Sequence, residues 1–324
     1  MKICIYGAGA IGGWIGTRLA QHGCEVSVVA RGATLEALQL HGLRLEANGQ
    51  VMSAPVRSSA DPADLGVQDL VIVAVKAPAM AGVAAAIAPL IGPDTMVLTA
   101  MNGVPWWFFE GFGGPYAGTR LKAVDPDGAI ARAIPGRHII GCVVHASCSL
   151  NSPGFVKQHF GNKLIVGEPS GARSPRIIEL AALLESAGLE ASLSDQIQKD
   201  AWFKLWGNMT VNPISAMTGA TTDLILDDEL VRAFISSVML EAREIGERIG
   251  IPIGQSPEDR HQLTRKLGAF KTSMLQDVEA GKAVELDALV TVVRELGQLT
   301  AVATPFTDAL LGLSRLHAKV HHLY

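Results

Sequence analysis

The 324-residue sequence contains little charge, few aromatic side chains and no long apolar run. Charged residues make up 18% and aromatic residues 5%, and the formal net charge is −4. Because no basic stripe is present, we expect no DNA or RNA partner. Hydrophobic residues reach 48%, yet the longest apolar runs, at 70–75 and 96–101, are far shorter than the about 18 residues that cross a membrane. The composition therefore predicts a globular protein without a membrane segment.

Cysteine is also scarce, and its spacing fits neither a metal site nor a redox motif. The four cysteines, Cys4, Cys24, Cys142 and Cys148, show no CxxC spacing, and we interpret them as structural thiols of a reducing compartment. The histidines show no ligand spacing with cysteine or carboxylates, so we expect no metal site. The stretch MKICIYGAGAIGG has one early lysine and an apolar run broken by glycine, unlike a signal peptide. These features predict a cytoplasmic protein.

The sequence does contain a regular alternation of strand and helix patterns over about its first hundred residues. Apolar segments indicate buried strands at 2–7, 25–31, 69–76 and 95–101, with helices at 11–23 and 78–92. Such an alternation is typical of a parallel sheet covered on both faces.

Two further regions carry strand patterns of another kind. Residues 43–59 indicate two short strands joined at Asn48-Gly49, which is a hairpin signal. Residues 137–167 indicate further strands, with turns at Pro153-Gly154 and Gly161-Asn162.

The character of the sequence changes near residue 195, where strand patterns disappear. Helical periodicity covers 196–211, 227–250, 257–280 and 286–318, and we expect the first of these helices to end near Asn212-Pro213. We therefore predict an α/β protein with a Rossmann-type domain at 1–195, followed by an all-helical domain at 196–324.

A glycine-rich turn, GAGAIG at 7–12, stands between the first strand and the first helix. In such a turn the first glycine permits the tight bend, the second lets the backbone approach a pyrophosphate, and the third lets the helix pack on the strand. The alternative is a glycine-rich turn of some other α/β fold. We predict that the cofactor diphosphate binds at Gly7, Gly9, Ala10, Ile11 and Gly12.

The ends of three strands carry polar residues that suit a cofactor site. The second strand ends in Arg31, with no carboxylate at its tip, and a guanidinium can grip a 2′-phosphate, so the sequence favours NADP over NAD. The alternative is a solvated surface arginine. Lys76 and Asn102 follow the next two strands, where ligands of open α/β sheets bind, although Lys76 alone could be an ordinary strand-end charge.

The segment AWFKLWGNMTVNPISAMTG, at 201–219, is an apolar helix with one polar line. Lys204, Asn208 and Asn212 follow one another at intervals of four, which places them on one helix face. A lysine on that face could give a proton to a carbonyl oxygen and stabilise the developing alkoxide, while the asparagines could bind a polar substrate. Alternatively, Lys204 could extend into solvent along an exposed stripe.

Taken together, these motifs resemble the ketopantoate reductase (2-dehydropantoate 2-reductase) family. The resemblance rests on GAGAIG with Arg31 and Lys76, on the Asn102-Gly103 pair, on KLWGNMTVNPISA and on TSMLQDVEAGKAVELD. It covers both predicted domains in the same order.

The resemblance implies specific roles for residues of this chain. Lys204 would be the general acid, Asn208 and Asn212 would contact the substrate, and Ser273 would bind its carboxylate. Glu285 and Asn102 would lie near Lys204 and the nicotinamide ribose.

The resemblance also implies an activity. NADPH would reduce the C2 carbonyl of 2-dehydropantoate to give pantoate, on the route to pantothenate, and the helical domains could form a homodimer. Two alternatives stay open: the same chemistry on another small 2-oxo acid, and a non-catalytic NADP-binding redox sensor. The complete Lys-Asn-Glu set disfavours the sensor, which would need no proton donor.

The sequence departs from the family pattern at several positions. Ala79 stands where a glutamine is frequent, and Thr291 stands where a glycine is usual. The aromatic stretch VPWWFFEGF, which contains Trp106 and Trp107, follows Asn102. Either these residues reshape the pocket for another substrate, or the aromatic stretch is a buried packing cluster.

Overall fold

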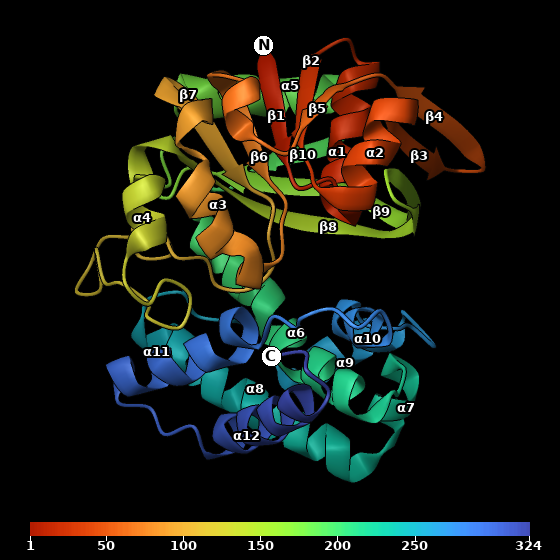
Figure 1. Ribbon diagram of the computed structural model, residues 1–324. Coiled ribbons are helices and arrows are strands. Elements are labelled where there is room, and N and C mark those ends of the chain that lie inside the picture. The colour runs from red at the N-terminus through yellow and green to blue at the C-terminus, as the bar shows by residue number, and fades with distance from the viewer. The chain divides into compact units, whose positions relative to one another are not determined.

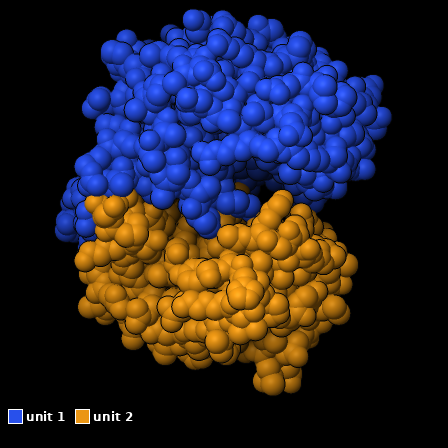
Figure 2. Space-filling model, viewed as in Figure 1, with its two compact units in different colours: residues 1–101, 107–120, 128–200 blue, residues 102–106, 121–127, 201–324 orange.

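The computed structural model describes residues 1–324 and divides into two compact units, which are coloured in Figure 2. Unit 1 comprises 1–101, 107–120 and 128–200, and unit 2 comprises 102–106, 121–127 and 201–324. Within the chain the main division thus falls at Asp200–Ala201, and two loop segments of the N-terminal half belong to unit 2.

Unit 1 is built on one ten-stranded mixed sheet (Figure 1). The strands are β1 Lys2–Tyr6, β2 Glu25–Val29, β3 Leu43–Ala47, β4 Gln50–Ala54, β5 Arg57–Ser59, β6 Gln68–Val73, β7 Ile91–Thr99, β8 Ile139–Ser152, β9 Phe155–Gly167 and β10 Glu190–Leu193. Their order is β4-β3-β9-β8-β7-β6-β1-β2-β5, and β10 pairs with β9. The run from β8 to β5 is parallel, as we predicted, whereas β8 with β9 and β3 with β4 are antiparallel.

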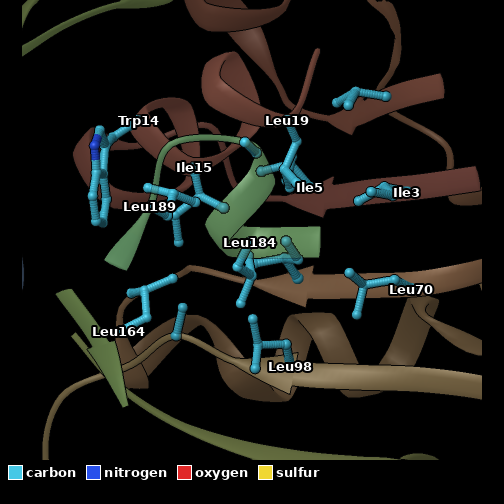
Figure 3. Packing of buried hydrophobic residues seen from close by; sticks show 14 of the residues in the cluster. Ile3, Ile5, Trp14, Ile15, Leu19, Leu70, Leu98, Leu164, Leu184 and Leu189 are labelled. Atoms are coloured by element: carbon cyan, nitrogen blue, oxygen red, sulfur yellow. The ribbon is translucent and has the colours of Figure 1, made fainter. Parts of the chain in front are cut away.

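The sheet curves around one helix of unit 1. The helices are α1 Ala10–Gln21, α2 Gly32–His41, α3 Met80–Ala86, α4 Ala129–Ala133 and α5 Pro175–Ser186. A Cβ at Gly16 of α1 would lie 2.9 Å from Ile5 of β1 and 3.0 Å from Leu43 of β3, two strands far apart in the sheet order. The sheet therefore wraps α1 as an open half-barrel, and Figure 3 shows Trp14 and Ile15 inside its core.

Several predictions for unit 1 are confirmed and others are wrong in detail. The Asn48-Gly49 hairpin is confirmed, since Ala47 pairs with Gln50 across it. The turn predicted at Gly161-Asn162 is wrong, because β9 continues through it and Gly161 lies where a Cβ would approach the His145 carbonyl oxygen to 2.5 Å. The helix predicted at 78–92 is shorter: proline lacks an N–H, and the chain around Pro89 forms a 3-10 turn, Ala88–Leu90.

Unit 2 is helical, as we predicted (Figure 1). Its helices are α6 Ile197–Thr218, which begins in unit 1, then α7 Thr222–Asp227, α8 Glu229–Arg248, α9 Pro257–Arg265, α10 Ser273–Glu279, α11 Val292–Thr300 and α12 Pro305–Val320. A π-helical turn, Asp287–Thr291, precedes α11. No helix of the protein has the length and apolar character needed to cross a membrane.

Three predicted helix boundaries in unit 2 are wrong. Helix α6 continues through Pro213, because the following residues Ile214 and Ala216 are buried and their packing offsets the one missing backbone bond. The helix predicted at 257–280 divides into α9 and α10. The one predicted at 286–318 is interrupted at Ala301, whose φ of 55° is left-handed.

Candidate active site

The glycine turn of unit 1 has a different structural reason for each glycine. Gly7 follows β1 with a φ of 98°, and a Cβ there would lie 2.6 Å from Val75. A Cβ at Gly12 would overlap the carbonyl oxygen of Gly7, so this glycine permits the contact between α1 and the loop. No atom lies within 4 Å of a Cβ built at Gly9. Of these three glycines, only Gly9 thus has space beside its backbone for a ligand.

The N-terminus of α1 has the features of an anion-binding site. Its N-cap is Gly9, no side chain caps it, and its first turn, which contains Ala10, Ile11 and Gly12, carries no acidic residue. The first N–H groups of a helix have no partners within the helix, and the helix dipole favours negative charge there. These residues fit the diphosphate of a dinucleotide.

Arg31 and Lys76 lie at the same sheet edge as this turn. The Gly7 N–H donates to the Val29 carbonyl at the end of β2, two residues before the exposed Arg31. On the other side of β1, the Ala74 N–H donates to the Tyr6 carbonyl, two residues before Lys76. Since β2 is followed by an arginine and not by a carboxylate, this edge suits the additional phosphate of NADP.

In unit 2, Lys204 of α6 is held by an amide. Its Nζ donates to Asn102 Oδ1 at 2.8 Å, and the pair is partly buried. The structure thus brings together two residues that are 102 positions apart, and Lys204 does not extend freely into solvent. One of the three ammonium protons is committed to Asn102.

The rest of α6 explains its polar line. Its apolar faces are buried, and Trp206 Nε1 donates to the Met239 carbonyl of α8 at 2.7 Å. Asn208 is partly exposed and Asn212 is 7% exposed, both on the face of Lys204. Packing therefore fixes the rotation of α6 and leaves one polar face.

The loop that carries Asn102 is fixed to the π-helical turn. The Val104 N–H donates to the Ala288 carbonyl at 2.9 Å, and Gly103 has a φ of 85°. A Cβ at Gly103 would lie 2.5 Å from the same carbonyl oxygen. Glu285 is buried just before this turn. Asn102 and Glu285 are therefore attached to one rigid segment.

Sequence reasoning singled out Thr291 but missed the hydrogen bonds that stabilise this turn. Thr291 Oγ1 and the Tyr324 hydroxyl both donate to Asp287 Oδ1, each at 2.8 Å, and the Val284 N–H donates to the Leu323 carbonyl. The spacing of Asp287 and Thr291 is a helical one that could have indicated this pair. Tyr324 gives no local signal, because its partner lies 37 positions away.

The remaining site residues lie as follows. Ser273 is the exposed first residue of α10, whose N-cap is the neighbouring Thr272. Trp106 and Trp107 are 5% and 2% exposed, and Trp107 Nε1 donates to Thr99 Oγ1 in unit 1. The aromatic stretch thus contributes to packing. The hydroxyl of Thr291 is used within its own turn.

Comparisons with known proteins agree on one family. The protein-family model described as "Ketopantoate reductase PanE/ApbA" matches residues 3–113 of this chain. The family model for the C-terminal part of the same proteins matches residues 196–318. A 2-dehydropantoate 2-reductase of Mesorhizobium japonicum is 48% identical over 97% of each chain.

Solved structures extend this likeness to the fold. A Ralstonia solanacearum protein that has been assigned as a ketopantoate reductase has a TM-score of 0.95 and 59% identity, covering 99% of both chains. D-mandelate dehydrogenase in a complex with NADH and anilino(oxo)acetate has a TM-score of 0.85 over 100% of both chains, but at 22% identity this likeness is one of fold.

Proposed function

The chain belongs to the ketopantoate reductase family, and we propose on this premise that it reduces 2-dehydropantoate to pantoate with NADPH. Ketopantoate reductases are NADPH-dependent oxidoreductases that act on a ketone, which agrees with the cofactor and the enzyme class that the sequence favours. The observation that carries the proposal for this chain is the hydrogen bond between Lys204 Nζ and Asn102 Oδ1. We further propose that the reaction is a step of pantothenate biosynthesis in the cytoplasm.

We assign the cofactor to a set of residues in unit 1 and at its sheet edge. The diphosphate would lie at the N-terminus of α1, and Arg31 and Lys76 would supply positive charge. These residues are Gly7, Gly9, Ala10, Ile11, Gly12, Arg31 and Lys76, and Asn102 and Glu285 would face the nicotinamide ribose. When bound, NADPH supplies the hydride.

Lys204 would act as the general acid. Its ammonium group gives a proton to the C2 oxygen as negative charge develops there, and it is left as a neutral amine. Asn102 accepts one ammonium hydrogen and so fixes the direction of the other two. Glu285, which is buried before the π-helical turn, would help to orient Lys204.

The substrate would lie against the polar face of α6. Asn208 and Asn212 can donate to and accept from its oxygens, and the Ser273 hydroxyl can donate to its carboxylate. We therefore assign cofactor binding to a domain at 1–195 and substrate binding to a domain at 196–324, and we propose that the protein forms a homodimer.

The proposal is tested by following NADPH oxidation with 2-dehydropantoate beside a panel of other 2-oxo acids. We expect a kcat/KM for 2-dehydropantoate of at least about 10⁴ M⁻¹s⁻¹, well above that of every other panel member. A higher kcat/KM for another 2-oxo acid would change the assigned substrate and leave the proposed reaction type unchanged. NADPH binding without turnover of any 2-oxo acid would refute the proposal.

A further inference from the structure

Arg260 of α9 is a charged residue with an aromatic neighbour but with no carboxylate partner. Its guanidinium carbon lies 5.2 Å from the centre of the Phe203 ring, and its Nε is buried without a hydrogen bond. The side chain forms no ion pair, and burial lowers the pKa of the guanidinium. An unpaired cation taken out of water destabilises a protein, so this arrangement needs a reason.

The neighbouring charges are committed elsewhere. Asp259 Oδ2 accepts hydrogen bonds from the Ser256 N–H and hydroxyl at the start of α9. Arg265, in the same helix, pairs with Asp227 at 2.6 Å in an exposed position. Arg260 thus differs from Arg265 both in its burial and in its lack of a carboxylate.

The guanidinium lies directly on the helix that carries Lys204. A Cβ at Gly207 would come within 2.5 Å of Arg260 Nη2, so the glycine makes room for this approach. Gly207 is three residues after Lys204 and adjacent to Asn208, and positions three apart are neighbours on a helix surface. Arg260 therefore packs on the face of α6 that is next to the face of the proposed proton donor.

We propose that Arg260 binds the carboxylate of the 2-oxo acid substrate, an inference that rests on the proposed function. A guanidinium matches a carboxylate with two parallel hydrogen bonds, and the Phe203 ring supports one of its faces. Since Nε is buried, the two Nη groups are the donors that remain for a ligand. In a 2-oxo acid the carboxylate is bonded to the carbon that is reduced. A cation that holds it must therefore lie close to the group that protonates the carbonyl oxygen.

A phosphate of the cofactor is the other anion that Arg260 could bind. The phosphates of NADP already have an assigned set of groups, namely the glycine turn, Arg31 and Lys76. Arg260 packs on the helix that carries Lys204, which favours the substrate, and NADPH affinity distinguishes the two.

The test compares Arg260→Met and Arg260→Lys with Arg265→Met, which removes an exposed arginine from the same helix. Each variant is assayed with 2-dehydropantoate and with its neutral lactone, which keeps the ketone and lacks the carboxylate. For Arg260→Met we expect kcat/KM for the acid to fall about 10- to 100-fold, through KM. The lactone kinetics and the Kd of NADPH should be unchanged. Arg260→Lys keeps the charge without the two-pronged guanidinium. Its kcat/KM for the acid should lie between the values of Arg260→Met and the natural protein.

Several outcomes would overturn the assignment. Equal losses with acid and lactone would make Arg260 a packing residue, and a weaker Kd for NADPH would make it a cofactor residue. If Arg260→Met does not fold, Arg260→Lys gives the same comparison through its acid-to-lactone ratio. Calorimetric titration of 2-dehydropantoate into the NADP⁺ complex separates the two proposals: Arg260-dependent binding without turnover would refute only the proposed function.

Discussion

The glycine turn of unit 1 and the Lys204 region of unit 2 are constructed in opposite ways. The turn is local: six consecutive residues, which run from the end of β1 into the first turn of α1, supply the bend, the close packing and the open backbone. The Lys204 region is assembled from the loop at 102–104, the middle of α6, the turn at 287–291 and the chain near Tyr324. A ligand that every enzyme of a class shares can be bound by a short standard element. A reacting group needs support from several directions.

The largest effect is expected at the centre of the dispersed region. Lys204→Ala should lower kcat by about 10²- to 10⁴-fold, because it removes the proposed proton donor, while the Kd of NADPH stays nearly unchanged. The matched control is Lys199→Ala, an exposed lysine in the same helix. Steady-state kinetics and fluorescence titration measure the two quantities, and an active Lys204→Ala variant would refute the assignment.

Two glycines of the turn should respond differently to the same substitution. Gly12→Ala should lower the free energy of unfolding by about 1–3 kcal/mol, because its Cβ overlaps the Gly7 carbonyl. Gly9→Ala has open space and should fold normally, yet it should weaken NADPH binding where the backbone must approach the diphosphate. Denaturant unfolding and NADPH titration of both variants test this, and a Gly9→Ala variant with unchanged NADPH affinity would contradict it.

The support of Asn102 is tested by Gly103→Ala. We expect a loss in kcat of about 10- to 100-fold, because the Cβ would collide with Ala288 and displace the asparagine. Gly113→Ala is the control, since Gly113 also has a positive φ, of 78°, but no atom within 4 Å of its Cβ position. Similar kcat losses in both variants would assign the effect to backbone strain.

The smallest effect is expected from Tyr324→Phe, which removes one hydrogen bond to Asp287. We expect a loss of up to about 1 kcal/mol in unfolding free energy. Burial, with the hydrogen bond and charge of Asp287, raises the pKa of Tyr324 from its ordinary value of 10.0 to about 12. The folded protein therefore holds this proton more tightly, so the stabilisation is present below pH 10 and is lost as the pH rises towards 12.

This pH dependence provides the check on Tyr324→Phe. Between those two pKa values the natural protein should lose more unfolding free energy than the variant, which has no phenol to titrate at this position. Parallel pH curves for the two proteins would show that the hydroxyl contributes nothing.

The local features of the molecule could be predicted from the sequence, and the contacts between distant segments could not. The glycine turn and the polar line of α6 are visible in the sequence, because each depends on spacing within one element. The end of α6 was misplaced because burial after Pro213 outweighs the local signal of proline. The contact between Lys204 and Asn102 could be inferred only through resemblance, since no local pattern links residues so far apart. Arg260 and Tyr324 were missed for that reason.

The path of the chain between the units has a consequence for modularity. Residues 121–127 belong to unit 2, where the Lys122 and Ala123 N–H groups donate to the Glu295 carboxylate at 2.7 and 2.8 Å. A single cut at residue 195 would therefore leave the C-terminal fragment without this segment and without Asn102. Exchange of the helical region between relatives, by recombination or by design, has to transfer three separate pieces of sequence to keep Lys204, the proposed proton donor, together with Asn102.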